Sequence, residues 1–170
     1  ASKYKSSVSS LKNEEIKSLN ELSEIGKPID SAYVKLLIPK DFQLNKFLYK
    51  QIGKKYCWTD RLDWSDQQWI KYVSQKYLYT YILKVNNDIA GFFELIHHKE
   101  QSESEIVYLG LLENFFGKKL GGYLLSEAIK ISWTFNSNRV WVHTCSLDHE
   151  NALNNYLARG MKIYNQEIVN

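Results

Sequence analysis

The chain has few cysteines and lacks long hydrophobic runs. Of its 170 residues only Cys57 and Cys145 are cysteines, too few and too far apart for a disulfide framework or a zinc site. No apolar stretch approaches the ~20 residues of a membrane-spanning helix, and the N-terminal residues lack the apolar centre of a secretory signal. We therefore expect a soluble protein of the reducing cytoplasm, with no metal and no membrane partner.

A large excess of charge of one sign is also missing. The 22 Lys and Arg residues against 19 Asp and Glu residues leave a formal net charge of +3 at pH 7, which falls short of the clustered basic face of nucleic-acid-binding proteins. An RNA-binding domain is therefore the least favoured functional class, and we expect no nucleic-acid partner. With 44% hydrophobic and 24% charged residues, the composition is typical of a globular domain.

Length and hydrophobic pattern predict one α/β (α+β) domain, because a chain of this size buries a single core. Residues 1–28 are predicted to be a polar tail and a peripheral helix, since apolar residues recur at near-helical intervals from Leu11 to Leu22. Residues 29–170 then form the domain. Within it the pattern predicts strands over 32–38, 78–85, 89–97, 105–112, 139–145 and 161–168, and helices over 41–52 (ended by Gly53), 65–77, 117–135 and 149–159.

Short polar signals mark several element ends. Asn86 and Asn87 tolerate tight-turn dihedrals and predict a β-hairpin between the second and third strands. Ser65, with Gln68 three residues on, predicts a capping box. Asp148 is interpreted first as a cap of the last helix.

The most informative stretch is the strand from Glu105, which a glycine-punctuated loop joins to the longest helix. The loop contains Gly117, Gly121 and Gly122, with Lys118 beside the first glycine. Unpaired amides and the positive end of the dipole make a helix N-terminus attractive to anions, and glycines let a phosphate approach the main chain. The alternative is that these glycines only permit close packing against the sheet.

The loop resembles the coenzyme A loop of the GNAT acetyltransferase superfamily, whose pattern is Gln/Arg-x-x-Gly-x-Gly/Ala between a strand and a helix. Phe116 stands at the Gln/Arg, Lys119 at the first glycine and Gly121 at the second. Gly117 matches a glycine often found after the Gln/Arg. Phe116 and Lys119 depart from the pattern, but main-chain amides tolerate different side chains.

Two further landmarks carry the same resemblance. Glu105 opens the strand where histone-acetyltransferase-like members have a general-base glutamate. Downstream, Ala152, Tyr156 and Gly160 are in register with the closing motif Asn-x-x-Ala-x-x-x-Tyr-x-x-x-Gly-Phe. The segment from Trp58 to Arg61 is similar to that of an uncharacterised bacterial subgroup.

The resemblance implies a three-layer sandwich with a mixed, centrally splayed sheet of about six strands and four or five helices. It also implies transfer of an acetyl group from acetyl-CoA to a primary amine of unknown identity, by a monomer or homodimer. Glu105 would be the base and Tyr156 the acid that protonates the leaving thiolate. The expected cofactor-binding residues are Leu109, Gly110, Leu111, Phe116, Gly117, Lys118, Lys119, Leu120, Gly121, Gly122 and Asn151.

Several assignments stay open at this level. Glu94, a carboxylate among aromatic residues, is either a rival base or a structural partner of an Arg or Lys. Trp58, Asp60 and Arg61 are candidates for acceptor binding, with pairing between Asp60 and Arg61 as another possibility. The departures in the loop also leave room for a catalytically silent CoA-binding or regulatory module.

Overall fold

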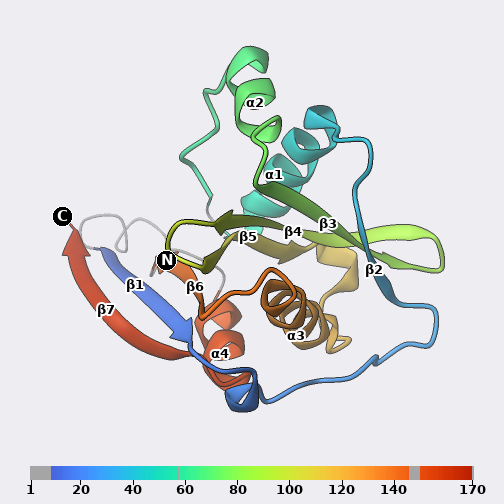
Figure 1. The fold of residues 1–170 in the computed structure, drawn as a ribbon. Coiled ribbons are helices and arrows are strands. Elements are labelled where there is room, and N and C mark those ends of the chain that lie inside the picture. The colour runs from blue at the N-terminus through green and yellow to red at the C-terminus, as the bar shows by residue number, and fades with distance from the viewer. Residues whose placement is uncertain (1–8, 57, 146–149, 170) are drawn as a thin grey trace.

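The computed structural model describes residues 9–56, 58–145 and 150–169, which form a mixed sheet with helices on both faces (Figure 1). Cys57 and the predicted cap Asp148 lie outside these residues. The described strands are β1 (Ser9–Ile16), β2 (Tyr33–Leu36), β3 (Leu78–Val85), β4 (Asp88–His98), β5 (Glu103–Leu111), β6 (Arg139–Cys145) and β7 (Lys162–Val169), and the described α-helices are α1 (Phe42–Tyr56), α2 (Asp66–Val73), α3 (Leu120–Trp133) and α4 (Glu150–Ala158).

The sheet order is β2-β3-β4-β5-β6-β1-β7, seven strands in the described chain where about six were expected. All neighbours are antiparallel except β5 and β6, which α3 connects as a crossover. The two strands of this parallel pair are paired only over a short stretch, from Glu103 opposite Arg139 to Ile106 opposite Val142. Beyond it, β5 continues to Leu111 and β6 to Cys145. The sheet therefore splits between β5 and β6, which confirms the predicted central splay.

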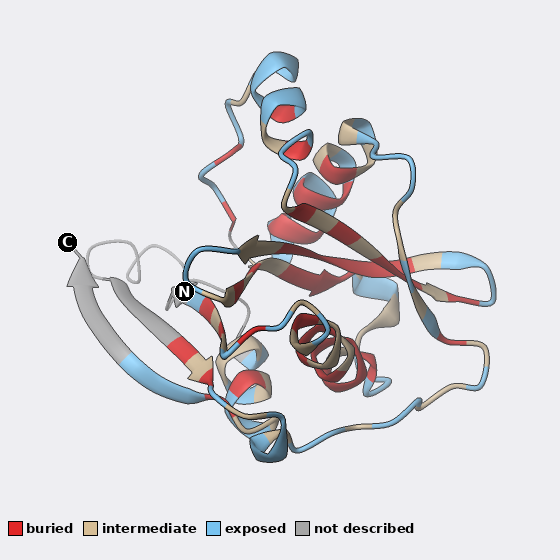
Figure 2. Ribbon diagram, in the orientation of Figure 1, coloured by how far each residue is buried: buried red, intermediate tan, exposed pale blue. Residues whose placement is uncertain are grey.

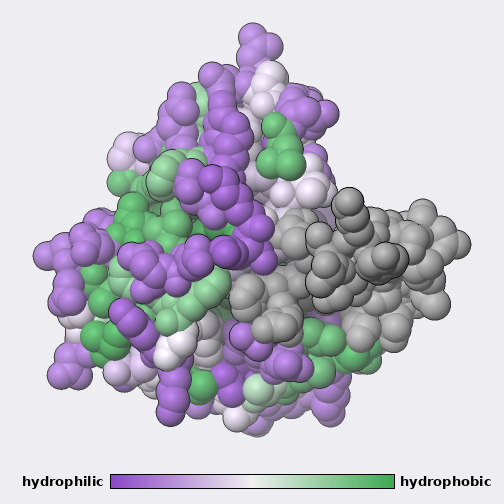
Figure 3. Space-filling model, turned by 180° about the vertical axis from the view of Figure 1, so that it is seen from behind, coloured by the Kyte–Doolittle hydropathy of each residue, from purple (hydrophilic) through white to green (hydrophobic). Residues whose placement is uncertain are grey.

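Two apolar clusters pack on opposite faces of the sheet. One joins α3 and α4 to residues such as Ile106, Leu109 and Val142, and the other joins α1 and α2 to residues such as Phe92 and Ile82. The central strands and the inner side of α3 are accordingly buried (Figure 2). Seen from behind, the top of the molecule, which carries α1 and α2, is mainly hydrophilic, while larger hydrophobic areas lie nearer the middle (Figure 3).

The local signals in the sequence form the predicted turns and caps. Asn86 and Asn87 have φ values of 52° and 67°, so the β3–β4 hairpin turns through two left-handed residues. Ser65 and Gln68 cap each other reciprocally at the start of α2.

Two predictions are wrong. The peripheral helix expected within residues 1–28 is instead β1, which lies between β6 and β7, followed by a 3-10 turn at Leu19–Glu21. Pairing on both edges outweighed the near-helical spacing of a few leucines. Gly53 does not end α1, which continues to Tyr56; a Cβ on Gly53 would lie 3.1 Å from Trp58 Cβ, so this glycine permits close packing.

Candidate functional site

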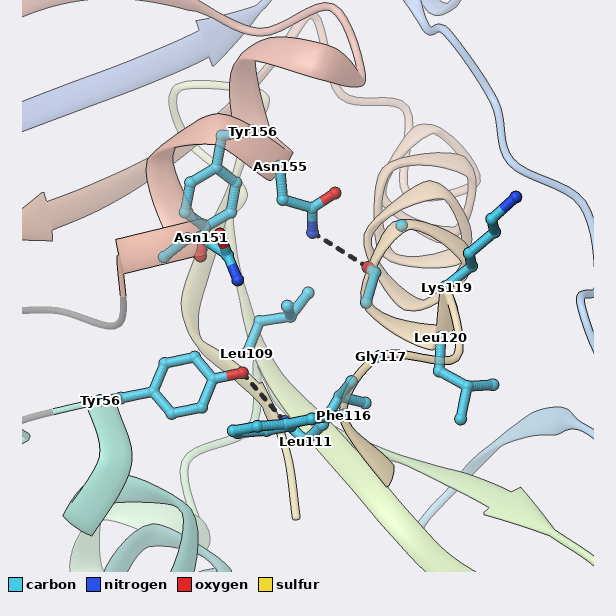
Figure 4. Close-up of a pocket in the computed structure, with 13 residues that line it drawn as sticks. Tyr56, Leu109, Leu111, Phe116, Gly117, Lys119, Leu120, Asn151, Asn155 and Tyr156 are labelled. Carbon is cyan, nitrogen blue, oxygen red and sulfur yellow. Dashed lines mark hydrogen bonds between the residues drawn. The ribbon is translucent and has the colours of Figure 1, made fainter. Parts of the chain in front are cut away.

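A cavity of about 350 Å³ lies where β5 and β6 separate, between the start of α3 and the start of α4 (Figure 4). We call it the α3 pocket. Its lining combines residues from α1, β5, the loop before α3, α3 and α4: Tyr56, Leu109, Leu111, Phe116, Gly117, Lys119, Leu120, Gly121, Gly122, Asn151, Ala152, Asn155 and Tyr156. The volume is in the range of small-molecule sites.

The edge of β5 presents main-chain groups to this pocket. Leu112 N–H donates to the Ala90 carbonyl at 2.8 Å. Hydrogen-bonded pairs alternate along an antiparallel ladder, so Gly110 also faces β4, whereas Leu109 and Leu111 turn their main-chain groups toward the split. In the described chain β6 no longer pairs with β5 at this level. A ligand with amide groups can therefore pair with this edge as an added strand would.

The loop before α3 brings several amides together. Gly117 has φ 76°, and Lys119, the N-cap, has φ 62° with ψ 13°. Left-handed residues in such a turn let successive N–H groups converge on an anion. Within the described part of the chain, the amides from Gly117 to Gly122 donate to no acceptor. They add to the positive end of the α3 dipole, so the loop fits the diphosphate of a nucleotide-like cofactor.

Helix α4 closes the other side of the pocket. Tyr156 is 5% exposed and, with Asn151, faces the cavity (Figure 4). Asn155 Nδ2 donates to the Gly121 carbonyl at 3.0 Å and so ties α4 to the first turn of α3. From α1, the Tyr56 hydroxyl accepts from Leu111 N–H at 3.3 Å.

Tyr56, Ala152 and Asn155 line the pocket but were not predicted as site residues. Ala152 and Asn155 lie within the motif that identified Tyr156, so helical spacing from Tyr156 was a usable signal. Tyr56 belongs to a different helix and gave no signal in sequence.

Two predicted cofactor residues do not line the cavity. Gly110 turns toward α1, where a Cβ would lie 2.6 Å from Ile52 Cγ2, so this glycine lets the helix approach the sheet. Lys118 lies over the Phe115 ring at 5.5 Å. Lys119 lines the cavity, but its side chain points away from Tyr156 and Asn151 (Figure 4).

Glu105 lies on β5 outside the α3 pocket, one residue before the last pair with β6. It is opposite Ile96 of β4, which packs against the α1–α2 cluster, so Glu105 faces that side of the sheet. Its side chain is 21% exposed, and its carboxylate lies 2.9 Å from His98 Nε2. The assignment of Glu105 as the base stays a prediction.

Glu94 is fully buried and paired with Arg61, which is 3% exposed. The carboxylate accepts from Arg61 Nη2 at 3.1 Å, from the Tyr72 hydroxyl at 2.7 Å and from Asn45 Nδ2 at 2.9 Å. We call these four residues the Arg61–Glu94 cluster. Burial alone lowers the pKa of Arg61, but Glu94 and Tyr72 outweigh it and hold that pKa above its ordinary value. The cluster is the structural pairing named as one alternative for Glu94.

The other acceptor-binding candidates also contact protein groups. Trp58 is 7% exposed and packs on Tyr49 and Tyr108. Asp60 does not pair with Arg61, because its carboxylate accepts from the Tyr49 hydroxyl at 3.0 Å and from the Tyr108 hydroxyl. Burial is the main reason that the pKa of Tyr49 rises to about 12, and the hydrogen bond to Asp60 adds to it.

The described residues show neither a metal-binding group nor a membrane span. No three His, Cys, Asp or Glu side chains among them gather as metal ligands. No helix in the described ranges is long and apolar enough to cross a bilayer.

Comparison with known proteins supports the same fold. The model of the "Acetyltransferase (GNAT) family" matches residues 42–161. A functionally unknown conserved protein from Staphylococcus epidermidis is 15% identical, with a TM-score of 0.65, covering 95% of this chain and 60% of its own. A GCN5-related N-acetyltransferase from Kribbella flavida is 11% identical, with a TM-score of 0.65, covering 94% of this chain and 56% of its own. An aminoglycoside acetyltransferase from an uncultured soil metagenomic sample is 14% identical, with a TM-score of 0.63, covering 78% of this chain and 90% of its own.

No curated protein sequence matches the chain. The chain spans less than two thirds of the Staphylococcus and Kribbella proteins, and at these identities the likeness shows a shared fold. The family match extends over more than half of the sequence and includes the β5–loop–α3 segment and all of α4. The chain therefore belongs to the acetyltransferase (GNAT) family.

Proposed function

We propose that the chain transfers the acetyl group of acetyl-CoA to a primary amine, by direct attack of the amine in a ternary complex. One observation supports this most: the edge of β5 that no longer pairs with β6 in the described chain and the amides between Gly117 and Gly122 line the same pocket. A pantetheine arm can hydrogen-bond to a strand edge, and a diphosphate accepts from amides at a helix N-terminus. Acetyl-CoA carries both groups.

When bound, acetyl-CoA supplies an activated acetyl thioester. Three groups of the chain then transfer protons or donate a hydrogen bond during the reaction. Alkyl amines are protonated at pH 7, so Glu105 takes a proton from the acceptor, directly or through water. Leu109 N–H, which faces the split, donates to the thioester carbonyl oxygen. Tyr156, at the wall of the pocket, donates a proton to the departing sulfur.

The acceptor is a primary amine in this proposal, and the reaction takes place in the cytoplasm by a monomer or homodimer. The aminoglycoside acetyltransferase among the structural neighbours makes an aminoglycoside a reasonable member of a test panel. The panel also contains L-lysine, spermidine and a lysine-containing peptide, which differ in size and charge.

Two measurements test the proposal. Titration calorimetry should show saturable binding of acetyl-CoA, and a thiol reagent should detect amine-dependent release of CoA. Gly117→Asp should weaken acetyl-CoA binding at least about tenfold, because it adds a like charge and a side chain at φ 76°. Gly26→Asp is the matched control, since a Cβ at Gly26 meets nothing within 4 Å. Equal affinities for the two variants would contradict the phosphate assignment.

A CoA-binding module without turnover is the second candidate. It is favoured by Phe116 and by Lys119, a non-glycine residue in left-handed conformation where the family pattern has glycine. Binding of acetyl-CoA without thiol release for any amine of the panel would support the module and contradict the enzyme.

A further inference from the structure

We infer that His98 is a positioning residue that holds the Glu105 carboxylate in place for proton abstraction, and that Trp141 fixes the His98 ring. The inference rests on the proposed function, in which Glu105 is the base. Nε2 of the His98 ring lies 2.9 Å from the Glu105 carboxylate.

Three neighbouring strands supply the three side chains. His98 is the last residue of β4, Glu105 lies on β5, and Trp141 is directly opposite Glu105 on β6. The His98 and Trp141 rings are stacked, with centroids 5.9 Å apart and planes inclined by 14°. Directly opposite residues of a sheet project from the same face. The trio therefore sits on the α1–α2 side of the sheet, next to the point where β5 and β6 separate.

Arg139, which lies on the same face, has other partners. Arg139 pairs with Glu15 and, at 3.3 Å, with Glu103. His143 follows two residues after Trp141 and shares its face. Among the described residues, His98 is the hydrogen-bond partner of the Glu105 carboxylate.

A catalytic carboxylate works best when supporting groups fix its orientation. A glutamate side chain has three rotatable bonds, and Glu105 is partly exposed, so without a partner it samples several positions. The imidazole N–H anchors one oxygen and leaves the other to accept the proton. Packing against Trp141 in turn restricts the imidazole ring, as second partners do for ligating histidines.

The kinetic test compares five variants using acetyl-CoA and the amine of the panel that gives the fastest release of CoA. Glu105→Gln should lower kcat about a hundredfold. His98→Ala should lower kcat about tenfold with KM for acetyl-CoA unchanged, while His98→Gln, whose amide can donate from nearly the same place, should stay within about threefold. The double variant His98→Ala/Glu105→Gln should be no slower than Glu105→Gln alone, because the two act as one unit.

His97→Gln is the matched control. His97 faces the other side of β4, where its ring stacks on Phe135 and Nδ1 lies 3.4 Å from Ser104 Oγ. The kcat of His97→Gln should therefore equal that of the wild type. The inference would be overturned if His98→Ala had no effect on kcat. It would also be overturned if the losses of kcat in His98→Ala and Glu105→Gln multiplied in the double variant.

A measurement without turnover separates this inference from the proposed function. In spectra of ¹⁵N-histidine-labelled protein, the ring signals of His98 should change in Glu105→Gln while those of His97 do not. Unchanged His98 signals would overturn the inference even if the enzyme is active. A changed signal together with no CoA release for any amine would instead count against the proposed function alone.

Discussion

The two faces of the sheet use polar groups in opposite ways. On the α1–α2 side, the Arg61–Glu94 cluster is buried: the Glu94 carboxylate accepts from Arg61, Tyr72 and Asn45, and the Arg61 guanidinium also lies over aromatic rings. On the α3–α4 side, the α3 pocket is lined mainly by apolar side chains and by main-chain amides without acceptors in the described chain. The comparison indicates that the cluster holds the fold, whereas the pocket keeps its hydrogen-bonding capacity for a ligand.

The largest expected effect is on stability, from breaking the buried pair. Glu94→Gln leaves the Arg61 charge uncompensated, and loss of one partner of a buried pair typically costs about 3–5 kcal/mol. The free energy of unfolding in urea measures it, and acetyl-CoA affinity of the folded protein should stay the same. Glu24→Gln, which breaks an exposed pair with Lys130, should cost less than about 1 kcal/mol. Similar losses for the two variants would remove the contrast between the regions.

The next largest effect is expected at alkaline pH, which should lower the free energy of unfolding through tyrosines on the α1–α2 side. Burial is the largest cause of the raised pKa values of Tyr49, Tyr72 and Tyr108. It raises the pKa of Tyr49 to about 12. A raised pKa means that the folded state keeps its proton longer than the unfolded chain, so the stabilisation is complete below pH about 10 and is lost as pH rises toward 12. Unfolding free energies between pH 8 and 11 should fall above pH 10, and Tyr49→Phe should reduce the fall. A flat profile would contradict the burial of these hydroxyls.

Two tyrosines sharpen the comparison further. Tyr156→Phe in the pocket should lower kcat about tenfold, about 1.4 kcal/mol of activation free energy, with little change in acetyl-CoA affinity or stability. Tyr72→Phe in the cluster should leave kcat unchanged and lower the free energy of unfolding, because its hydroxyl donates to a charged carboxylate. Weaker CoA binding with normal turnover in Tyr156→Phe would remove Tyr156 from the role of acid.

The smallest effect concerns the N-cap of α3. Lys119 has φ 62°, a conformation that costs a non-glycine residue about 1–2 kcal/mol, while glycine loses about 0.5–1 kcal/mol of chain entropy. Lys119→Gly should therefore stabilise the protein by up to about 1 kcal/mol in thermal unfolding and retain acetyl-CoA binding. Lys118→Gly, which relieves no left-handed conformation, should bring no gain.

The sequence was most informative where chemistry is local. Asn86 and Asn87 predicted the β3–β4 hairpin, and the glycines around Lys119 predicted the amide loop, because both depend on dihedral preferences of a few neighbouring residues. The motif around Tyr156, identified by its resemblance to the closing motif of the superfamily, lies at the wall of the pocket. The roles of Glu105 and Tyr156 in catalysis stay predictions.

Contacts between distant segments were predicted poorly. Arg61 was expected to meet an acceptor or Asp60 but pairs with Glu94, which lies 33 residues away on another strand. No local signal places His98 beside Glu105, whereas the register of β4 and β5 does. The segment from Leu11 to Leu22 carries a weak helical pattern, and yet residues 9–16 form β1, which inserts between β6 and β7.

The sequence by itself indicated the family, through motifs that resemble those of known members, and it determined the main elements of the domain and the place of the glycine loop, because these follow from local periodicity and from glycine spacing. Only the tertiary structure decided which carboxylate is buried in an ion pair, which one meets a histidine, and which strand completes the sheet. Those outcomes depend on register and on packing between segments that are far apart along the chain, and neither quantity is encoded in any short stretch of residues.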